Sequence, residues 1–169
     1  GPSGTGKSTL LYIMSGLLRP SAGDVFLQGQ DLTTLPDRVV TDLRRTQVGF
    51  VFQETNLFQA LTVEGNLRFV QSLNKSRQPD EAKITRYLEE LGLGARRIFL
   101  PNQLSVGQRR RLVVARALIN DAPLILADEP TNDLDENWAS KVMSLLAGVV
   151  EQGGAVVMVT HNHHWAQKA

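Results

Sequence analysis

Short apolar runs alternate along this chain with polar stretches of helical character. Residues 48–52, 124–127 and 155–160 are rich in Val, Ile, Leu or Phe, which predicts three buried strands. A shorter strand is expected at residues 24–28, between two glycines. Buried strands that alternate with helices indicate a parallel sheet covered by helices, and therefore the α/β class.

Helices are predicted between these strands. The expected ranges are residues 9–14, 36–45 and 138–150. From about residue 57 onward the chain is mostly helical in pattern, with Ile84, Leu88 and Leu91 on one face of a helix that ends near Gly92. The stretch of residues 57–110 is therefore interpreted as a helical insertion into the sheet domain.

Composition fits one globular domain and excludes several chemistries. The 169 residues are 42% hydrophobic and 21% charged, and the net charge of +1 gives no support for a surface that binds nucleic acid or anionic lipid. The chain has no cysteine, which excludes disulfides, thiolate metal sites and cysteine nucleophiles. The longest apolar runs fall short of the ~18–20 residues of a membrane span.

The first residues, GPSGTGKS, match the phosphate-binding pattern G-x-x-x-x-G-K-[ST]. The glycines let backbone N–H groups turn toward phosphate oxygens, Lys7 can reach the β- and γ-phosphates, and the Ser8 hydroxyl can ligate Mg²⁺. The helix that follows directs the positive end of its dipole at an anion. A glycine-rich turn alone is a weak signal, but the full pattern followed by a helix predicts a nucleoside triphosphate site.

Two adjacent carboxylates, Asp128 and Glu129, follow the apolar run at residues 124–127. They are expected at the edge of the sheet where α/β proteins place ligands. Asp128 can hold Mg²⁺, directly or through water, and Glu129 can polarise a water that attacks the γ-phosphate. An isolated Asp-Glu pair would be interpreted as a solvated turn, but beside a phosphate loop the pair favours catalysis.

A third motif begins at Ser105. Ser105 and Gln108 have the spacing of a capping box, which predicts the start of a helix that runs to about Leu118. The same geometry offers a hydroxyl and free backbone N–H groups to an anion, and both interpretations can hold. The arginines at residues 109–111 add positive charge, although such runs on helices usually form solvated faces.

Taken together, these motifs resemble the nucleotide-binding domain of ABC-type ATPases, in the order typical of that family. The resemblance covers nearly the whole chain and includes Gln53 after a strand, a signature at residues 104–108, and His161 after the last strand. It implies a P-loop NTPase. Residues 1–56 and 111–169 are expected to form a RecA-like core with a parallel sheet, and residues 57–110 an inserted helical subdomain that carries the signature.

The resemblance also implies a role for each motif residue. The phosphates of ATP are expected to contact Ser3, Gly4, Gly6, Lys7, Ser8 and Thr9. Mg²⁺ is expected to be held by Ser8, Gln53 and Asp128. The expected catalytic residues are Glu129 as general base, His161 as γ-phosphate contact, and Gln53, which contacts the attacking water and senses the transport partner. Residues expected to serve the nucleotide of a second subunit are Ser105, Gly107, Gln108 and Asp135.

Residues 127–131, ADEPT, resemble the lipoprotein-release and macrolide-export group of the family. That likeness implies an energising subunit that couples ATP hydrolysis to export or lipoprotein release. Its partners would be a second ATP-binding subunit, in a homodimer, and an integral-membrane permease, with no direct contact to nucleic acid. It would lie peripherally on the cytoplasmic face of the inner or plasma membrane. The alternative is a soluble ABC ATPase that acts on ribosomes or DNA, because residues 131–135 partly resemble those members.

Two departures from the family pattern bear on function. Val106 stands where the family has glycine. If this position needs a positive φ, Val is strained by about 1–2 kcal/mol, and hydrolysis is slower than in a Val106→Gly variant. The family's strand before the phosphate loop and its adenine-stacking aromatic residue have no counterpart here. The chain is therefore expected to be truncated at both ends and inactive by itself.

Overall fold

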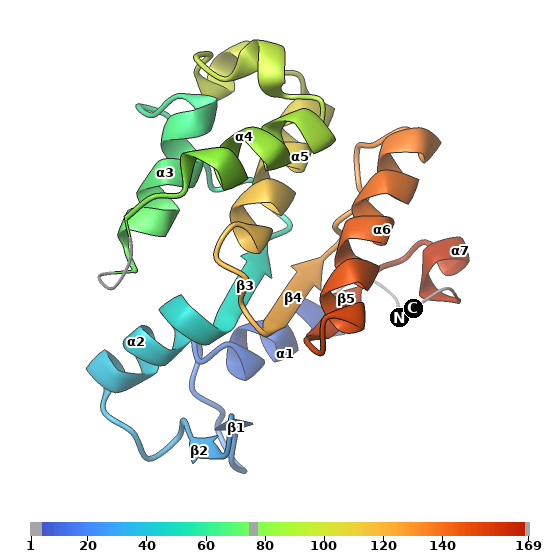
Figure 1. Ribbon diagram of the computed structural model, residues 1–169. Coiled ribbons are helices and arrows are strands. Elements are labelled where there is room, and N and C mark those ends of the chain that lie inside the picture. Colours follow the sequence, from blue (N-terminus) through green and yellow to red (C-terminus); the bar gives the residue numbers. More distant parts are fainter. Residues whose placement is uncertain (1–4, 75–77, 168–169) are drawn as a thin grey trace.

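The computed structural model describes residues 5–74 and 78–167, and its centre is a parallel three-stranded sheet (Figure 1). The strands β3 (Val48–Val51), β4 (Leu124–Asp128) and β5 (Ala155–Val159) lie side by side in the order β3-β4-β5. Val48 pairs with Leu124, and Leu124 pairs with Ala155, so the carboxyl ends of all three strands meet at one edge. The predicted strands and the α/β class are confirmed.

Helices cover the sheet and connect its strands. The helix α1 (Lys7–Met14) contacts β4, α2 (Asp37–Gln47) leads directly into β3, and α6 (Glu136–Glu151) packs along β5. A four-residue helix, α7 (His163–Ala166), follows β5. Each of the three longer helices begins within two residues of its predicted start.

The strand expected at residues 24–28 is shorter than predicted. Only β1 (Phe26–Leu27) and β2 (Gln30–Asp31) pair, as a small antiparallel hairpin. Gln28 and Gly29 between them have φ angles of 51° and 75°, the left-handed conformation of a tight two-residue hairpin turn. The turn ends the strand before Gln28, because the chain reverses there.

The middle of the chain is helical, as predicted. It contains α3 (Val63–Ser72), α4 (Glu81–Glu90), two short 3₁₀ turns (Gly94–Arg96 and Pro101–Gln103) and the start of α5 (Val106–Leu118). In Figure 1 α3 and α4 lie beyond the carboxyl ends of the strands, and α5 descends from them to the sheet. The helix α5 runs through residue 110, so the predicted boundary between core and helical subdomain falls inside one helix.

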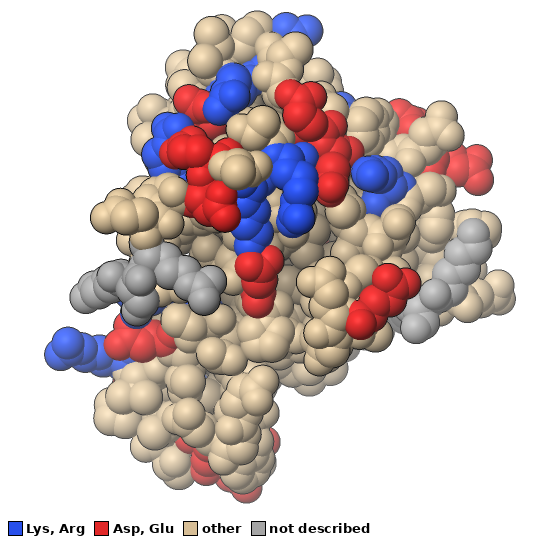
Figure 2. All heavy atoms as spheres, viewed as in Figure 1, with Lys and Arg blue, Asp and Glu red and all other residues tan. Residues whose placement is uncertain are grey.

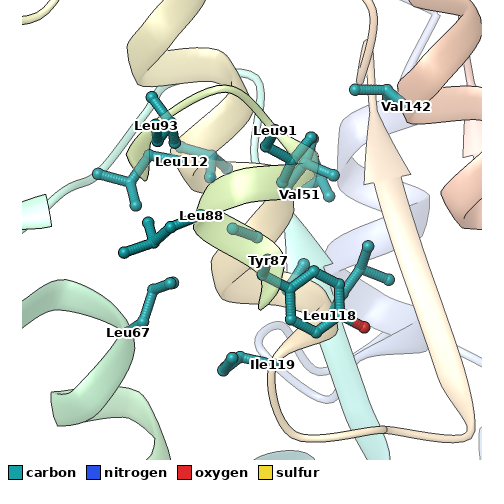
Figure 3. Packing of buried hydrophobic residues seen from close by; sticks show 14 of the residues in the cluster. Val51, Leu67, Tyr87, Leu88, Leu91, Leu93, Leu112, Leu118, Ile119 and Val142 are labelled. Carbon is teal, nitrogen blue, oxygen red and sulfur yellow. The ribbon is translucent and has the colours of Figure 1, made fainter. Parts of the chain in front are cut away.

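One hydrophobic cluster joins the helical part to the sheet. Figure 3 shows Leu67 of α3, Leu88 of α4, Leu112 of α5, Val51 of β3 and Val142 of α6 within it, all at most 1% exposed. The division of the chain at residues 57 and 110 remains a prediction, because this shared core packs both parts together.

The contact between α5 and β3 is especially close. A side chain at Gly49 would place its Cβ 2.2 Å from the carbonyl oxygen of Ala117 and 2.5 Å from Cδ1 of Ile125. Only glycine allows this approach, so the helix backbone lies directly on the strand. This contact fixes where α5 lies in space relative to β3.

On the face shown in Figure 2, basic and acidic side chains are intermixed over the helical part. The pairs include Arg68 with Glu81 at 2.8 Å and Arg97 with Glu64 at 2.7 Å. Within residues 5–74 and 78–167, no helix combines the length and apolar character needed to cross a membrane.

Candidate functional site

A polar cleft of about 420 Å³ opens at the carboxyl edge of the sheet. It is formed by the start of α1, the segment after β3 and the ends of β4 and β5, which meet there because the strands are parallel. The residues that line it are Thr5, Gly6, Lys7, Ser8, Thr9, Gln53, Asp128, Glu129, Asn132 and His161. The fold therefore brings together the described residues of four separate sequence motifs.

The start of α1 forms one wall of the cleft. Gly6 is its N-cap residue and has a φ of 80°, a conformation that side-chain-bearing residues rarely adopt. Glycine has no side chain with which to cap the helix, so the start of α1 carries no side-chain cap and its positive dipole end faces the cleft, where it suits an anion. The predicted residues Ser3 and Gly4 lie outside the described part of the chain.

Ser8 and Asp128 meet at the base of the cleft. The Ser8 hydroxyl donates a hydrogen bond to Oδ2 of Asp128, whose side chain is buried at the end of β4. The amide of Gln53 adds a further oxygen to the same cleft. Hydroxyl, carboxylate and amide oxygens are the hard donors that Mg²⁺ prefers, so these residues fit a magnesium ion.

The neighbouring carboxylate, Glu129, is held by the segment that follows β5. Its Oε1 accepts a hydrogen bond of 2.8 Å from the backbone N–H of His161, and Nδ1 of the same histidine lies 2.9 Å away. Its Oε2 accepts a bond of 3.1 Å from the hydroxyl of Thr160. Glu129 itself has a φ of 51°, a costly conformation for a residue other than glycine and one that is frequent at functional sites. These hydrogen bonds fix the orientation of the Glu129 carboxylate in the cleft.

The remaining predicted residues do not line this cleft. Ser105 and Gln108 form the predicted capping box: Gln108 N–H donates to Ser105 Oγ at 3.2 Å, and Ser105 N–H donates to Gln108 Oε1 at 2.9 Å. Asp135 caps α6 by accepting a 3.0 Å bond from the N–H of Trp138. Both helix starts are at the surface. The role of these residues, and of Gly107, toward a second subunit remains a prediction.

The strain expected at Val106 is not present. Val106 is the first residue of α5, its φ is not positive, and its side chain is 50% exposed. The tight position is its neighbour Gly107, where a Cβ would lie 3.0 Å from the carbonyl oxygen of Asp133. A helix start needs no positive φ, so the position accepts a branched residue, and the close approach falls one residue later.

The sequence predicts that the arginines at residues 109–111 form a solvated face, and this prediction is wrong. Arg110 and Arg111 are only 3% and 8% exposed. Arg111 donates to the carbonyl of Leu91, and its guanidinium lies 3.8 Å from the centre of the Trp138 ring. Burial lowers the pKa of both arginines. The prediction failed because α5 is enclosed by the sheet, α4 and α6, so that even polar positions near its start are covered.

Sequence reasoning missed three contributors to the site. Asn132 lines the cleft, and the Thr160 hydroxyl donates a hydrogen bond to Glu129. Arg110 donates a hydrogen bond to the backbone carbonyl of Gln53. No local sequence pattern identifies Thr160 or Arg110, because each contacts a residue that is distant in the sequence and is brought close only by the fold.

Comparisons with known proteins agree with this site. The profile of the family described as "ABC transporter" matches residues 1–132. An ABC transporter ATP-binding protein of Thermotoga maritima is 42% identical over 96% of this chain and 70% of its own length. The lipoprotein-releasing system ATP-binding protein LolD of Shewanella denitrificans is 43% identical over 99% of this chain and 73% of its own.

Two further matches extend the comparison. The macrolide export ATP-binding/permease protein MacB of a Shewanella species is 42% identical over the whole chain, which spans only 26% of that protein. A solved structure of the ATP-binding cassette MJ0796, dimeric and bound to ADP and Pi, superposes with a TM-score of 0.93 at 38% identity, covering 99% of this chain and 75% of that one. The chain belongs to the ABC transporter family, which confirms the resemblance and the P-loop NTPase fold inferred from the motifs.

Proposed function

We propose that this chain binds and hydrolyses ATP as the energising part of an ABC transporter of the export or lipoprotein-release type. The observation that carries the proposal is the single cleft in which Lys7, the Ser8–Asp128 pair and Glu129 meet. The names of its relatives LolD and MacB support the transporter type. The alternative, an ABC ATPase that acts on ribosomes or DNA, finds no support in these relatives.

Each residue of the cleft has a part in the reaction. The start of α1 and Lys7 bind the β- and γ-phosphates. Ser8, Gln53 and Asp128 would hold a Mg²⁺ ion, which would neutralise charge on the phosphate oxygens. The oxygen of a water bonds to the γ-phosphorus as the bond from phosphorus to the ADP oxygen breaks, and Glu129 takes the proton of that water. His161 orients Glu129 and contacts the γ-phosphate.

A second copy of the chain would complete the site. Ser105, Gly107 and Gln108 lie at the exposed start of α5, where the positive end of the helix dipole suits the γ-phosphate of a nucleotide held by another copy. Asp135 lies at the start of α6, where it would contact that copy. Solved relatives with this fold are described as dimers. A homodimer with two nucleotides at its interface follows from this arrangement.

The segment after β3 borders the nucleotide cleft and also a second hollow, which would be the surface for the permease. An apolar groove of about 600 Å³ is lined by Phe50 and Phe52 of the β3 region and by the exposed side chains of Leu17, Phe58 and Leu73. The groove and the cleft share the segment that carries Gln53, so a permease helix docked there would act directly on the site. In MacB the ATP-binding and permease functions are named together for one chain. The chain would then lie on the cytoplasmic face of the membrane.

The decisive experiment replaces Glu129 by glutamine in the full-length protein. Glu129→Gln keeps the shape and one of the two hydrogen-bond acceptors but cannot act as a base, so hydrolysis should fall at least about 100-fold while ATP binding is retained. Phosphate release and the dissociation constant of a fluorescent ATP analogue measure the two quantities. Glu151→Gln, at the exposed end of α6, is the matched control. Equal hydrolysis by Glu129→Gln and wild type would refute the proposal.

A further inference from the structure

Arg110 is a buried cation outside the cleft lining that contacts the backbone of the segment carrying Gln53. It lies on α5, five residues after Ser105, and its side chain is only 3% exposed. Its two terminal nitrogens donate to successive carbonyl oxygens, those of Phe52 at 2.8 Å and Gln53 at 2.6 Å. The planar guanidinium therefore holds the carbonyls of the two peptide units that flank the Cα atom of Gln53.

Its immediate neighbours on α5 point elsewhere. Arg109 donates to the carbonyl of Leu104 at 2.6 Å, and Arg111 donates to Leu91 and stacks on Trp138. Consecutive helical residues are turned by about 100° from one another, so Arg110 reaches the segment after β3 and its two neighbours do not. Six residues further along α5, Arg116 donates to the carbonyls of Thr55 and Asn56. Two arginines of one helix thus hold both ends of the segment.

The electrostatic setting keeps Arg110 charged despite its burial. Burial lowers its pKa, but the charges of Asp133, Asp128 and Glu129 oppose that shift. The nearest of these, Asp133, has its Oδ2 3.7 Å from Arg110. For Arg116, which has no such carboxylate, burial lowers the pKa to about 10. A charged guanidinium forms stronger hydrogen bonds to carbonyls than a neutral donor, so the contact of Arg110 with the Gln53 segment is firm.

We infer that Arg110 is a positioning residue that keeps the side chain of Gln53 in the nucleotide cleft. Gln53 is exposed and lies just beyond the end of β3, where the ladder of the sheet no longer holds the backbone. The two carbonyl contacts replace the ladder at that point and fix the direction in which Gln53 leaves the strand. The inference rests on the proposed function, because it assigns Gln53 a part in hydrolysis.

A double-mutant cycle separates positioning from a merely structural role. ATP hydrolysis and thermal unfolding are measured for the full-length wild type, Arg110→Gln, Gln53→Ala and the double variant. Arg110→Gln should lower kcat about tenfold in the wild type and leave it unchanged in the Gln53→Ala background. It should lower the unfolding temperature equally in both backgrounds, because Gln53→Ala retains the backbone carbonyls. A loss of hydrolysis that multiplies in the double variant would overturn the inference.

A second readout does not depend on hydrolysis. Amide hydrogen exchange of a peptide covering residues 52–56, followed by mass spectrometry, should be faster in Arg110→Gln than in wild type. Arg86→Gln is the matched control: Arg86 is an exposed arginine of α4 whose guanidinium lies 5.0 Å from the centre of the Tyr87 ring, and its replacement should change neither exchange nor kcat. Unchanged exchange in Arg110→Gln overturns the inference. Absence of ATPase activity in the wild type contradicts the proposed function instead, and the exchange comparison then decides whether Arg110 holds the segment.

Discussion

Two hollows flank the segment after β3, and they are built in opposite ways. The cleft is polar, and its charged groups Asp128 and Glu129 are buried and hydrogen-bonded to partners on other elements. The groove is larger and apolar, with side chains such as Phe58 and Leu73 about 40% exposed. The cleft is organised before any ligand arrives, whereas the groove exposes apolar surface that a partner would cover.

This difference sets what each hollow tolerates. Residues of the cleft are positioned by hydrogen bonds with defined geometry, so one changed atom alters its chemistry. Residues of the groove act through buried area, so their effect grows with the size of the side chain removed and appears only with the partner present. The contrast can be tested at the floor of the groove and on its rim, and the start of α5 lies beside neither hollow.

The largest effect is expected at the floor of the groove, where α5 lies on β3. In Gly49→Ala the new methyl group would overlap the carbonyl of Ala117 and the side chain of Ile125, and neither backbone can move without disturbing the sheet. The free energy of unfolding should fall by about 3 kcal/mol, as measured by urea denaturation.

The matched control for this change has the opposite sign. Gly148 lies inside α6, and no atom lies within 4 Å of the Cβ that alanine would add there. Gly148→Ala should therefore stabilise the protein by about 0.5–1 kcal/mol, through helix propensity alone. If both substitutions shifted the urea midpoint alike, the close packing of α5 on β3 would be contradicted.

A smaller effect is expected on the rim of the groove. In Leu73→Ser an exposed apolar side chain at the end of α3 becomes polar, so a docked permease loses buried area. The ratio of permease-stimulated to basal ATP hydrolysis should fall about fivefold in reconstituted vesicles. Val150→Ser changes a side chain of similar exposure on α6, away from the groove, and should leave that ratio as it was. A similar fall in both variants would show that the groove is not the docking surface.

The same contrast explains what could be predicted from the sequence. The cleft depends on motifs that are contiguous, such as the phosphate loop and Asp128-Glu129, and the parallel order of the strands brings their ends together. Lys7 is predicted from the phosphate-loop pattern, whereas Gln53 and His161 are predicted only by the resemblance to the family. The strand β3 was predicted because residues 48–52 form a short apolar run rich in residues that favour strands.

The parts that could not be predicted depend on contacts between distant elements. The groove takes its lining from the segment after α1 and from α2, β3, α3 and α5, and each apolar residue alone would be interpreted as part of the core. Arg110 carries no local mark of burial, since its partners are backbone carbonyls 57 and 58 residues away. Backbone carbonyls are the same at every position, so a sequence does not show which of them a side chain will meet.

The smallest effect concerns the start of α5, beside neither hollow, and its sign is informative. The strain expected from the sequence would make Val106→Gly stabilising, by release of about 1–2 kcal/mol. The structure places Val106 at the first turn of a helix with an ordinary φ, so Val106→Gly should instead destabilise by up to about 1 kcal/mol, because glycine loses more backbone entropy. Gly107→Ala, whose methyl group would press on the carbonyl of Asp133, should cost somewhat more. Thermal unfolding of the two variants beside wild type measures both, and a higher unfolding temperature for Val106→Gly would restore the strain hypothesis.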